Sequence, residues 1–267
     1  MFRTISIMTY AVLAYSLGMA SLGLLFLWYG NLLPGNWQVM SSESYLESAV
    51  INFFLFLAFC IQHSVMARPA FKERWTRVIP SYLERSTFVL VSSLALFAVL
   101  LLWQPLGGTV WAIENQAFRC VIHTCYAVGW TIVVGSTFAL SHADFFGLRQ
   151  AYYAATNREY TPIGFSEPRM YQHVRHPLYV GLILLSWATP DMTPTHLGFA
   201  LLLTSYILVA VRWEERDLVQ AHGEKYRSYA ARTPRLLPRF KVGKQSEPAT
   251  LATTPATLKT DSGVFRA

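Results

Sequence analysis

Residues 175–181 (RHPLYVG) combine two basic side chains, a proline and a glycine at spacings that suit the start of a membrane helix. Pro177 fits the first position of a helix, because its missing N–H would lack a partner there. Such a helix directs the positive end of its dipole toward Arg175 and His176, and it favours an anionic group beside them. Pro177 and Gly181 share one face of little bulk, where a ligand can approach the backbone. A basic cap on a membrane helix with a small packing face explains the same residues equally well.

A second cluster follows the last apolar segment, at residues 212–238. Adjacent carboxylates, Glu214 and Glu215, directly after a membrane helix are costly and are therefore candidates for function. One of them can hold an ammonium, a ribose hydroxyl or a ligand that bears a sulfonium. Tyr226 and Tyr229 lie on one side of a helix and can close over an adenine ring. The alternative is a solvated amphipathic helix with ion pairs along it, which better explains the other charged residues here.

A third cluster joins two segments that each follow an apolar stretch. His63 and Arg68 come at the end of one stretch, and His142 and Asp144 follow another. We expect both pairs at similar depth. A His–Asp pair there can deprotonate a thiol, with the carboxylate fixing the tautomer of the imidazole. An interfacial cap with satisfied hydrogen bonds is the alternative for either histidine, and the sequence does not choose between them.

The composition requires lipid around the elements that position these residues. Of 267 residues, 53% are hydrophobic and only 14% are charged, whereas soluble domains carry about 25% charged residues. These values exclude a disordered, collagenous or coiled-coil chain. The three cysteines do not suggest a disulfide framework. Cys120, His123 and Cys125 lack a second pair of ligands, so we expect no metal site.

Uncharged apolar windows predict an all-α, polytopic membrane bundle of about five to six transmembrane segments. The first four windows approach the length of a spanning helix. The last two are short and are separated only by residues 190–195, so they predict a C-terminal helical hairpin, and the sequence leaves open whether it spans fully. The windows are Met8–Tyr29, Ala49–Met66, Ser86–Trp103, Val121–Leu140, Leu178–Thr189 and His196–Val211.

The distribution of Lys and Arg predicts the orientation. They gather in residues 1–7, 67–85, 141–176 and 212–267, and Arg119 alone lies in an alternate connection. By the positive-inside rule, both termini are cytoplasmic. The net charge of +7 then faces anionic lipid headgroups, so no nucleic acid is implied. We expect one membrane domain over residues 1–240, with N-terminal helices in 8–140, a cofactor-binding half in 170–240 and a disordered tail at 241–267.

An ordered set of residues in the C-terminal half resembles the isoprenylcysteine carboxyl methyltransferase superfamily. The N-terminal half is similar to its bacterial NnrU-like branch through Gln62-His63-Ser64, Glu84-Arg85 and residues 142–148 (HADFFGL). The chain offers no sign of a cleft for a long isoprenoid, so the prenylated substrate does not carry over. The C-terminal set consists of Arg175, His176, Pro177, Tyr179, Gly181, Trp187, Glu214, Glu215, Leu218, Gly223, Tyr226, Tyr229, Pro234 and Pro238.

The resemblance implies a methyltransferase of the bacterial inner membrane that uses S-adenosyl-L-methionine as methyl donor. The acceptor it implies is a small volatile thiol, methanethiol, which would become dimethyl sulfide by in-line transfer to the thiolate. The donor would bind against Arg175, His176, Pro177, Tyr179 and Gly181, with Glu214 or Glu215, Tyr226 and Tyr229 completing the site. His63 or His142 would be the base, oriented by Asp144, with Arg68 stabilising the thiolate or the carboxylate of the donor.

Other functions stay open at this point. The acceptor can be another small thiol, or a carboxylate like that of an isoprenylcysteine. The run Gly-x-x-Tyr-x-x-Tyr at 223–229 is also similar to the NADPH-dependent membrane sterol reductases, which are usually longer. A membrane subunit without any cofactor would leave His176 and the paired carboxylates without a role. The sequence gives no oligomeric state.

Overall fold

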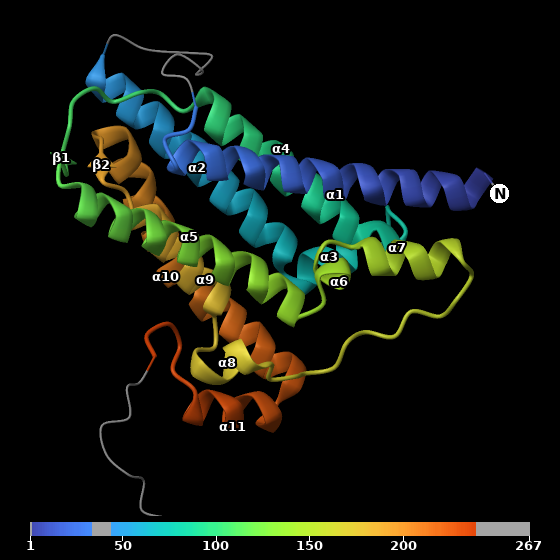
Figure 1. The fold of residues 1–267 in the computed structure, drawn as a ribbon. Helices are drawn as coiled ribbons and strands as arrows, with labels where there is room; N and C mark the ends of the chain where they lie inside the picture. Colours follow the sequence, from blue (N-terminus) through green and yellow to red (C-terminus); the bar gives the residue numbers. More distant parts are fainter. Residues whose placement is uncertain (1, 34–43, 239–267) are drawn as a thin grey trace, which may run out of the picture.

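The computed structural model describes residues 2–33 and 44–238, and in these ranges the chain is mostly helical, with two very short strands (Figure 1). The expected disordered tail, 241–267, lies outside the described residues. The elements are α1 (Phe2–Tyr29), α2 (Tyr45–Ala67), α3 (Pro69–Trp75), η1 (Ser81–Leu83), α4 (Glu84–Leu102), β1 (Trp111–Ala112), α5 (Gln116–Ala139), α6 (His142–Phe145), α7 (Leu148–Ala155), α8 (Arg169–His173), α9 (Pro177–Trp187), β2 (Asp191–Met192), α10 (Pro194–His222) and α11 (Glu224–Arg232).

Five helices are long and apolar enough to cross a membrane, namely α1, α2, α4 with η1, α5 and α10. A chain segment in lipid must satisfy its own backbone hydrogen bonds, which a helix does. The expected all-α polytopic membrane bundle is therefore confirmed. The largest difference from the apolar windows is at α10, which continues from Val211 to His222. The helix persists there because its charged residues Arg212 and Arg216 are exposed.

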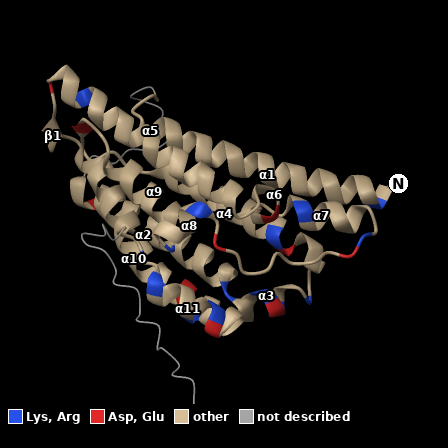
Figure 2. Ribbon diagram, turned by 60° about the horizontal axis from the view of Figure 1, so that its bottom comes forward, with Lys and Arg blue, Asp and Glu red and all other residues tan. Residues whose placement is uncertain are grey.

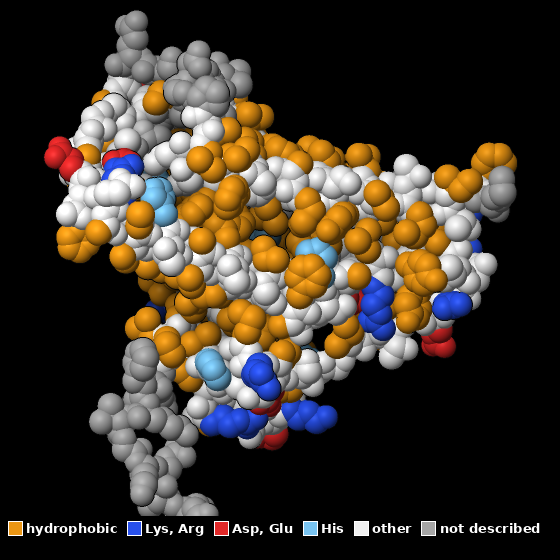
Figure 3. Space-filling view, in the orientation of Figure 1, with side chains coloured by type: hydrophobic (Ala, Val, Ile, Leu, Met, Phe, Trp, Pro, Cys, Tyr) orange, Lys and Arg blue, Asp and Glu red, His pale blue; other side chains and the backbone are white. Residues whose placement is uncertain are grey.

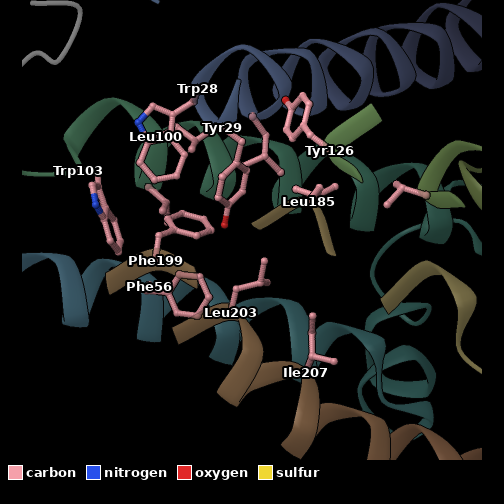
Figure 4. Packing of buried hydrophobic residues seen from close by; sticks show 13 residues of the cluster. Trp28, Tyr29, Phe56, Leu100, Trp103, Tyr126, Leu185, Phe199, Leu203 and Ile207 are labelled. Atoms are coloured by element: carbon pink, nitrogen blue, oxygen red, sulfur yellow. The ribbon is translucent and has the colours of Figure 1, made fainter. Parts of the chain in front are cut away.

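The core of the bundle is aromatic and draws on all six apolar helices. α5 packs along α9, α1 along α4, and α4 along α2. Trp28 and Tyr29 of α1 meet Phe199 of α10 and Trp103 after α4 (Figure 4). Apolar side chains also cover much of the outer surface between the two ends of the bundle (Figure 3). Such a surface is typical of a protein whose sides face lipid.

One end of the bundle carries the two short strands, and we call it the strand end. β1 and β2 pair antiparallel, with Trp111 opposite Met192. Arg119 and Asp191 form a bidentate ion pair with distances of 2.8 and 2.7 Å. The tip of the α9–α10 hairpin therefore reaches the same end as the α4–α5 connection (Figure 1). α9 has 11 residues, which corresponds to a length of about 16 Å. This is about half the thickness of the hydrocarbon core of a membrane. α9 alone is therefore too short to cross a membrane as a helix.

The opposite end, which we call the charged end, carries the short helices α3, α6, α7, α8 and α11 (Figure 1). Lys, Arg, Asp and Glu gather on these helices (Figure 2). Of the ion pairs within residues 2–33 and 44–238, only Arg119–Asp191 lies at the strand end. All three clusters from the sequence are found at the charged end, as expected from their positions at the ends of apolar windows that the distribution of Lys and Arg places on one side.

Candidate active site

Glu215 on α10 is the centre of a buried cluster of charges at the charged end. Its Oε1 accepts hydrogen bonds from Arg175 Nε at 2.7 Å and lies 3.2 Å from His176 Nε2. Its Oε2 accepts from Arg235 Nε at 2.9 Å and Nη2 at 2.6 Å. Both oxygens are therefore occupied by the protein's own cations. Glu215 acts as a clamp between α9, α10 and the segment after α11.

The backbone reinforces this clamp. Arg175 N donates to Pro234 O at 2.8 Å, and His176 N donates to Arg235 O at 3.2 Å. Arg175 Nη1 also donates to the carbonyl of Thr233 at 2.6 Å. The entry to α9 and the exit from α11 are thus held side by side. This contact depends on residues about sixty positions apart in the sequence.

Glu214 differs from its neighbour because it stays accessible. Its side chain is 39% exposed, and within the described structure it accepts one hydrogen bond, from Tyr179 OH at 2.6 Å. His176 Nδ1 lies 3.7 Å from Glu214 Oε2, and the His176 ring stacks on Tyr179 at 5.5 Å. Glu214 therefore has acceptor capacity left for a ligand.

The start of α9 agrees with the sequence, but its glycine has another role. Pro177 is the first helical residue and His176 is the N-cap, as predicted. The expectation of a ligand groove at Gly181 is wrong, because a Cβ there would lie 2.7 Å from Gly129 O and 2.9 Å from a methyl group of Val133. Gly181 is buried between α9 and α5. It permits close packing of these helices, so no ligand reaches it.

Tyr226 and Tyr229 of α11 face the same cluster in different ways. Tyr229 OH donates to Tyr171 O at 2.6 Å, and burial raises its pKa to about 12. Tyr226 is buried, yet its hydroxyl has no hydrogen-bond partner in the described structure. It lies within electrostatic range of Glu214, Glu215 and Arg175, and burial raises its pKa. A buried hydroxyl without a partner is costly, so Tyr226 is the tyrosine with a donor to offer a ligand.

His142 is part of an aromatic cluster. Its ring stacks on Phe138 at 4.3 Å and packs against Phe146 and Tyr15. Nδ1 lies 2.8 Å from Thr137 Oγ1, and Nε2 lies 3.1 Å from Tyr15 OH. Burial lowers the pKa of His142. With both nitrogens occupied, this histidine matches the alternative of a satisfied cap.

Asp144 does not orient His142, so the expected His142–Asp144 pair does not form. Its carboxylate Oδ1 accepts from Tyr160 OH at 2.9 Å and from Arg149 at 3.2 Å. Tyr160 lies in the connection 157–168 between α7 and α8, and burial and this hydrogen bond raise its pKa to about 12. Phe165, further along the connection, packs against Tyr226. Asp144 thus anchors a segment that crosses the charged end, which the sequence did not reveal.

His63 keeps one nitrogen free. Nδ1 lies 3.3 Å from Ser92 Oγ, and no hydrogen bond to Nε2 is found among residues 2–33 and 44–238. The ring packs against Phe59 and Phe88. Arg68, which follows the last residue of α2, forms an ion pair with Asp217 at 2.8 Å. Of the two histidines proposed as base, only His63 has a ring nitrogen without a hydrogen-bond partner in the described part of the chain.

Known proteins place the chain in a family. A methanethiol S-methyltransferase of Crocosphaera subtropica is 49% identical over 218 residues, which cover 81% of this chain and 85% of that protein. Methanethiol S-methyltransferase 2 of Bradyrhizobium diazoefficiens is 40% identical over 248 residues, covering 92% and 95%. The chain belongs to the methanethiol S-methyltransferase family. A more distant similarity joins it to Nurim of Xenopus laevis, with 27% identity over 198 residues, 69% of this chain and 68% of that protein. No family model and no solved structure matches the chain.

Sequence reasoning missed two residues that the structure brings to the candidate site. Arg235 closes the clamp on Glu215, and its only sequence signal is its place between Pro234 and Pro238. Arg85, at the start of α4, lies within electrostatic range of Asp144 and Glu214. Its signal was the pair Glu84-Arg85, an ionisable pair beside an apolar window.

Proposed function

We propose that this protein methylates methanethiol to dimethyl sulfide with S-adenosyl-L-methionine as methyl donor. One observation carries the proposal. An accessible carboxylate, Glu214, and a buried hydroxyl without a partner in the described structure, that of Tyr226, lie within electrostatic range of each other. The family assignment supports the same reaction, because the relatives at 49% and 40% identity carry its name. A methyltransferase requires a methyl donor, and we assign that donor to this place.

The residues at the charged end fit the groups of this donor. Glu214 offers a carboxylate oxygen to an ammonium or a ribose hydroxyl. Tyr226 OH offers a donor, and His176 and Tyr179 present stacked rings. The first N–H groups of α9 face the same side and suit an anionic group. Glu215 fixes the His176 ring through the contact of 3.2 Å to Nε2, and the Tyr229 ring packs against that of Tyr226.

The donor supplies a sulfonium methyl, and the thiolate sulfur forms the new C–S bond while the old bond leaves its electron pair on the donor sulfur. The protein must generate that thiolate, because a neutral thiol is a poor nucleophile. We assign His63 Nε2 as the base that accepts the proton of the thiol. Alignment of the two sulfur atoms by the bundle can be worth about 7–11 kcal/mol. Another small thiol is the remaining candidate acceptor.

We further propose that the charged end is cytoplasmic in the bacterial inner membrane. The Lys and Arg content of this end supports the orientation, since positive residues favour the cytoplasmic side. The donor is water-soluble and the thiol is apolar. Residues 1–240 would form one membrane domain, with the donor held by 170–240 and the acceptor by the helices of 8–140.

A headspace assay tests this proposal. Membranes that contain the chain are incubated with S-adenosyl-L-methionine and methanethiol, and dimethyl sulfide is measured in the gas phase. Glu214→Gln is the test variant, and Arg77→Gln, which removes an exposed charge on the same end, is the matched control. We expect product from the wild type and the control, and a strong loss in Glu214→Gln. Donor binding without any product in the wild type would contradict methanethiol as acceptor.

A further inference from the structure

Arg85 is an arginine at the membrane boundary without a carboxylate partner. Within residues 2–33 and 44–238, no acidic oxygen lies within 4.0 Å of its guanidinium. Its neighbours in sequence and space are paired differently, since Arg68 binds Asp217 at 2.8 Å and Lys72 lies 3.9 Å from Glu84. Arg85 thus lacks a direct ion pair, although Glu84, Asp144 and Glu214 lie within electrostatic range. A partly buried charge without a direct ion pair is costly, and it favours an anionic ligand.

The guanidinium is nevertheless held firmly in one place. Arg85 Nε donates to Phe145 O at 2.6 Å. Its central carbon lies 5.0 Å from the ring centre of Phe88 and 4.9 Å from that of Phe145. Cation–π contacts of this kind fix a guanidinium between apolar walls. Neither Nη atom has a hydrogen-bond partner among the described residues, so both are available.

Arg85 also lies close to His63 and within electrostatic range of Glu214. The Phe88 ring that contacts Arg85 packs against His63 as well, with the two ring centres 5.0 Å apart. Glu214, which we assign to the donor, lies within electrostatic range. The titratable and charged groups that face Arg85 from the surrounding elements are His63 of α2, Arg68 after α2, Lys72 of α3, Glu84 of α4, Asp144 of α6, Tyr160 of the connection 157–168 and Glu214 of α10.

We propose that the free Nη atoms of Arg85 bind the thiolate sulfur of the acceptor and favour its ionised form. This proposal rests on the proposed function and assigns the acceptor side of that same site. The ligand chemistry follows from the surroundings, which hold a guanidinium without a direct ion pair between two apolar rings. A small thiolate brings one negative charge and a methyl group that suits Phe88 and Phe145.

The carboxylate of the methyl donor fits this place less well. The amino-acid end of that donor carries an ammonium next to its carboxylate. Binding it at Arg85 would bring a further positive charge close to Arg68 and Lys72, whose repulsion opposes the attraction of the ammonium to Glu84 and Asp144. The thiolate has no such cation. A guanidinium beside a thiol lowers the pKa of the thiol, and each unit by which it does so raises the thiolate fraction about tenfold below that pKa.

Two measurements test the role of Arg85 separately from the methyl-transfer reaction. Purified wild type, Arg85→Gln and the exposed control Arg77→Gln are saturated with S-adenosylhomocysteine, which cannot transfer a methyl group. Methanethiol is then added, and the ultraviolet difference absorbance of the thiolate is recorded near neutral pH. We expect this band in the wild type and the control and its loss in Arg85→Gln. The affinity for S-adenosylhomocysteine, measured by calorimetry, should stay within about threefold of wild type, since Arg85 does not touch the donor.

The pH profile of turnover gives the second readout. In Arg85→Gln the rising limb of kcat/KM for methanethiol should move to higher pH, with a loss of at least about tenfold near neutral pH. Arg85→Lys keeps the charge, and we expect it to retain part of the thiolate band, which guards against a folding defect in the glutamine variant. An unchanged band and profile in Arg85→Gln would overturn the proposal, and so would loss of donor affinity with the band intact. A wild type that shows the band but forms no dimethyl sulfide would overturn only the proposed function.

Discussion

Substituting Glu215 and Glu214 one at a time distinguishes the structural role of Glu215 from the ligand-binding role that we propose for Glu214. In Glu215→Gln, the Arg175 guanidinium loses the charge that compensates it, and both side chains are only about one tenth exposed, 10% for Arg175 and 11% for Glu215. Removing one partner of a buried ion pair costs about 3–5 kcal/mol. The contact to Arg235, whose side chain is 44% exposed, adds no more than about 1 kcal/mol. For a domain of this size that lowers the melting temperature by on the order of 10 °C.

Glu214→Gln should show the opposite pattern. It removes the charge of an accessible carboxylate, while the amide oxygen can still accept from Tyr179, so the stability should change by about 1 kcal/mol or less. Donor affinity should fall about 10- to 150-fold, which corresponds to the 1.5–3 kcal/mol of a hydrogen bond to a charged group. Thermal melts of the purified proteins and calorimetry with S-adenosylhomocysteine give both numbers. A Glu215→Gln variant that melts like wild type but no longer binds would refute the clamp.

Further substitutions test other parts of the structure. Gly181→Ala should destabilise the bundle by several kcal/mol because its Cβ meets Gly129 O at 2.7 Å, whereas Gly23→Ala, which meets nothing within 4 Å, should leave the melting temperature almost unchanged. Asp144→Asn should speed tryptic cleavage at exposed Arg158 in the connection 157–168, and equal cleavage rates would disprove the anchor. The hydrogen bond from Arg119 lowers the pKa of Asp191, so the stability it provides is present above the ordinary pKa of Asp and is lost as the pH falls through the lowered value. Asp191→Asn should therefore flatten the acid side of a plot of melting temperature against pH.

The sequence predicted the helices and the charged end because both depend on local composition. The long apolar windows, whose length is set by the thickness of a membrane, coincide with long helices. Pro177 is the first residue of α9, a position where its missing N–H costs no hydrogen bond. The division of roles inside the site was not accessible in this way. Adjacent carboxylates look alike in sequence, and only the backbone pairing of Arg175 with Pro234 turns Glu215 into the clamp.

Sequence spacing gave wrong predictions for residues whose surroundings are set by segments distant in the sequence. A glycine four residues after Pro177 suggests a groove, but α5 fills that face through Gly129. Asp144 lies two residues from His142, yet Tyr160 and Arg149 take its carboxylate. For Arg85 the folded chain was needed as well, because only there is it visible that no carboxylate oxygen among the described residues lies within 4.0 Å of its guanidinium.

Transfer of a labelled methyl group tests the central claim most directly. The purified protein is mixed with methanethiol and S-adenosyl-L-methionine that carries a trideuterated methyl group, and the headspace is analysed by mass spectrometry. We predict dimethyl sulfide with one deuterated methyl group per donor consumed, and almost none from Glu214→Gln at limiting donor. Unlabelled product, or no product from a wild type that binds the donor, would contradict the account.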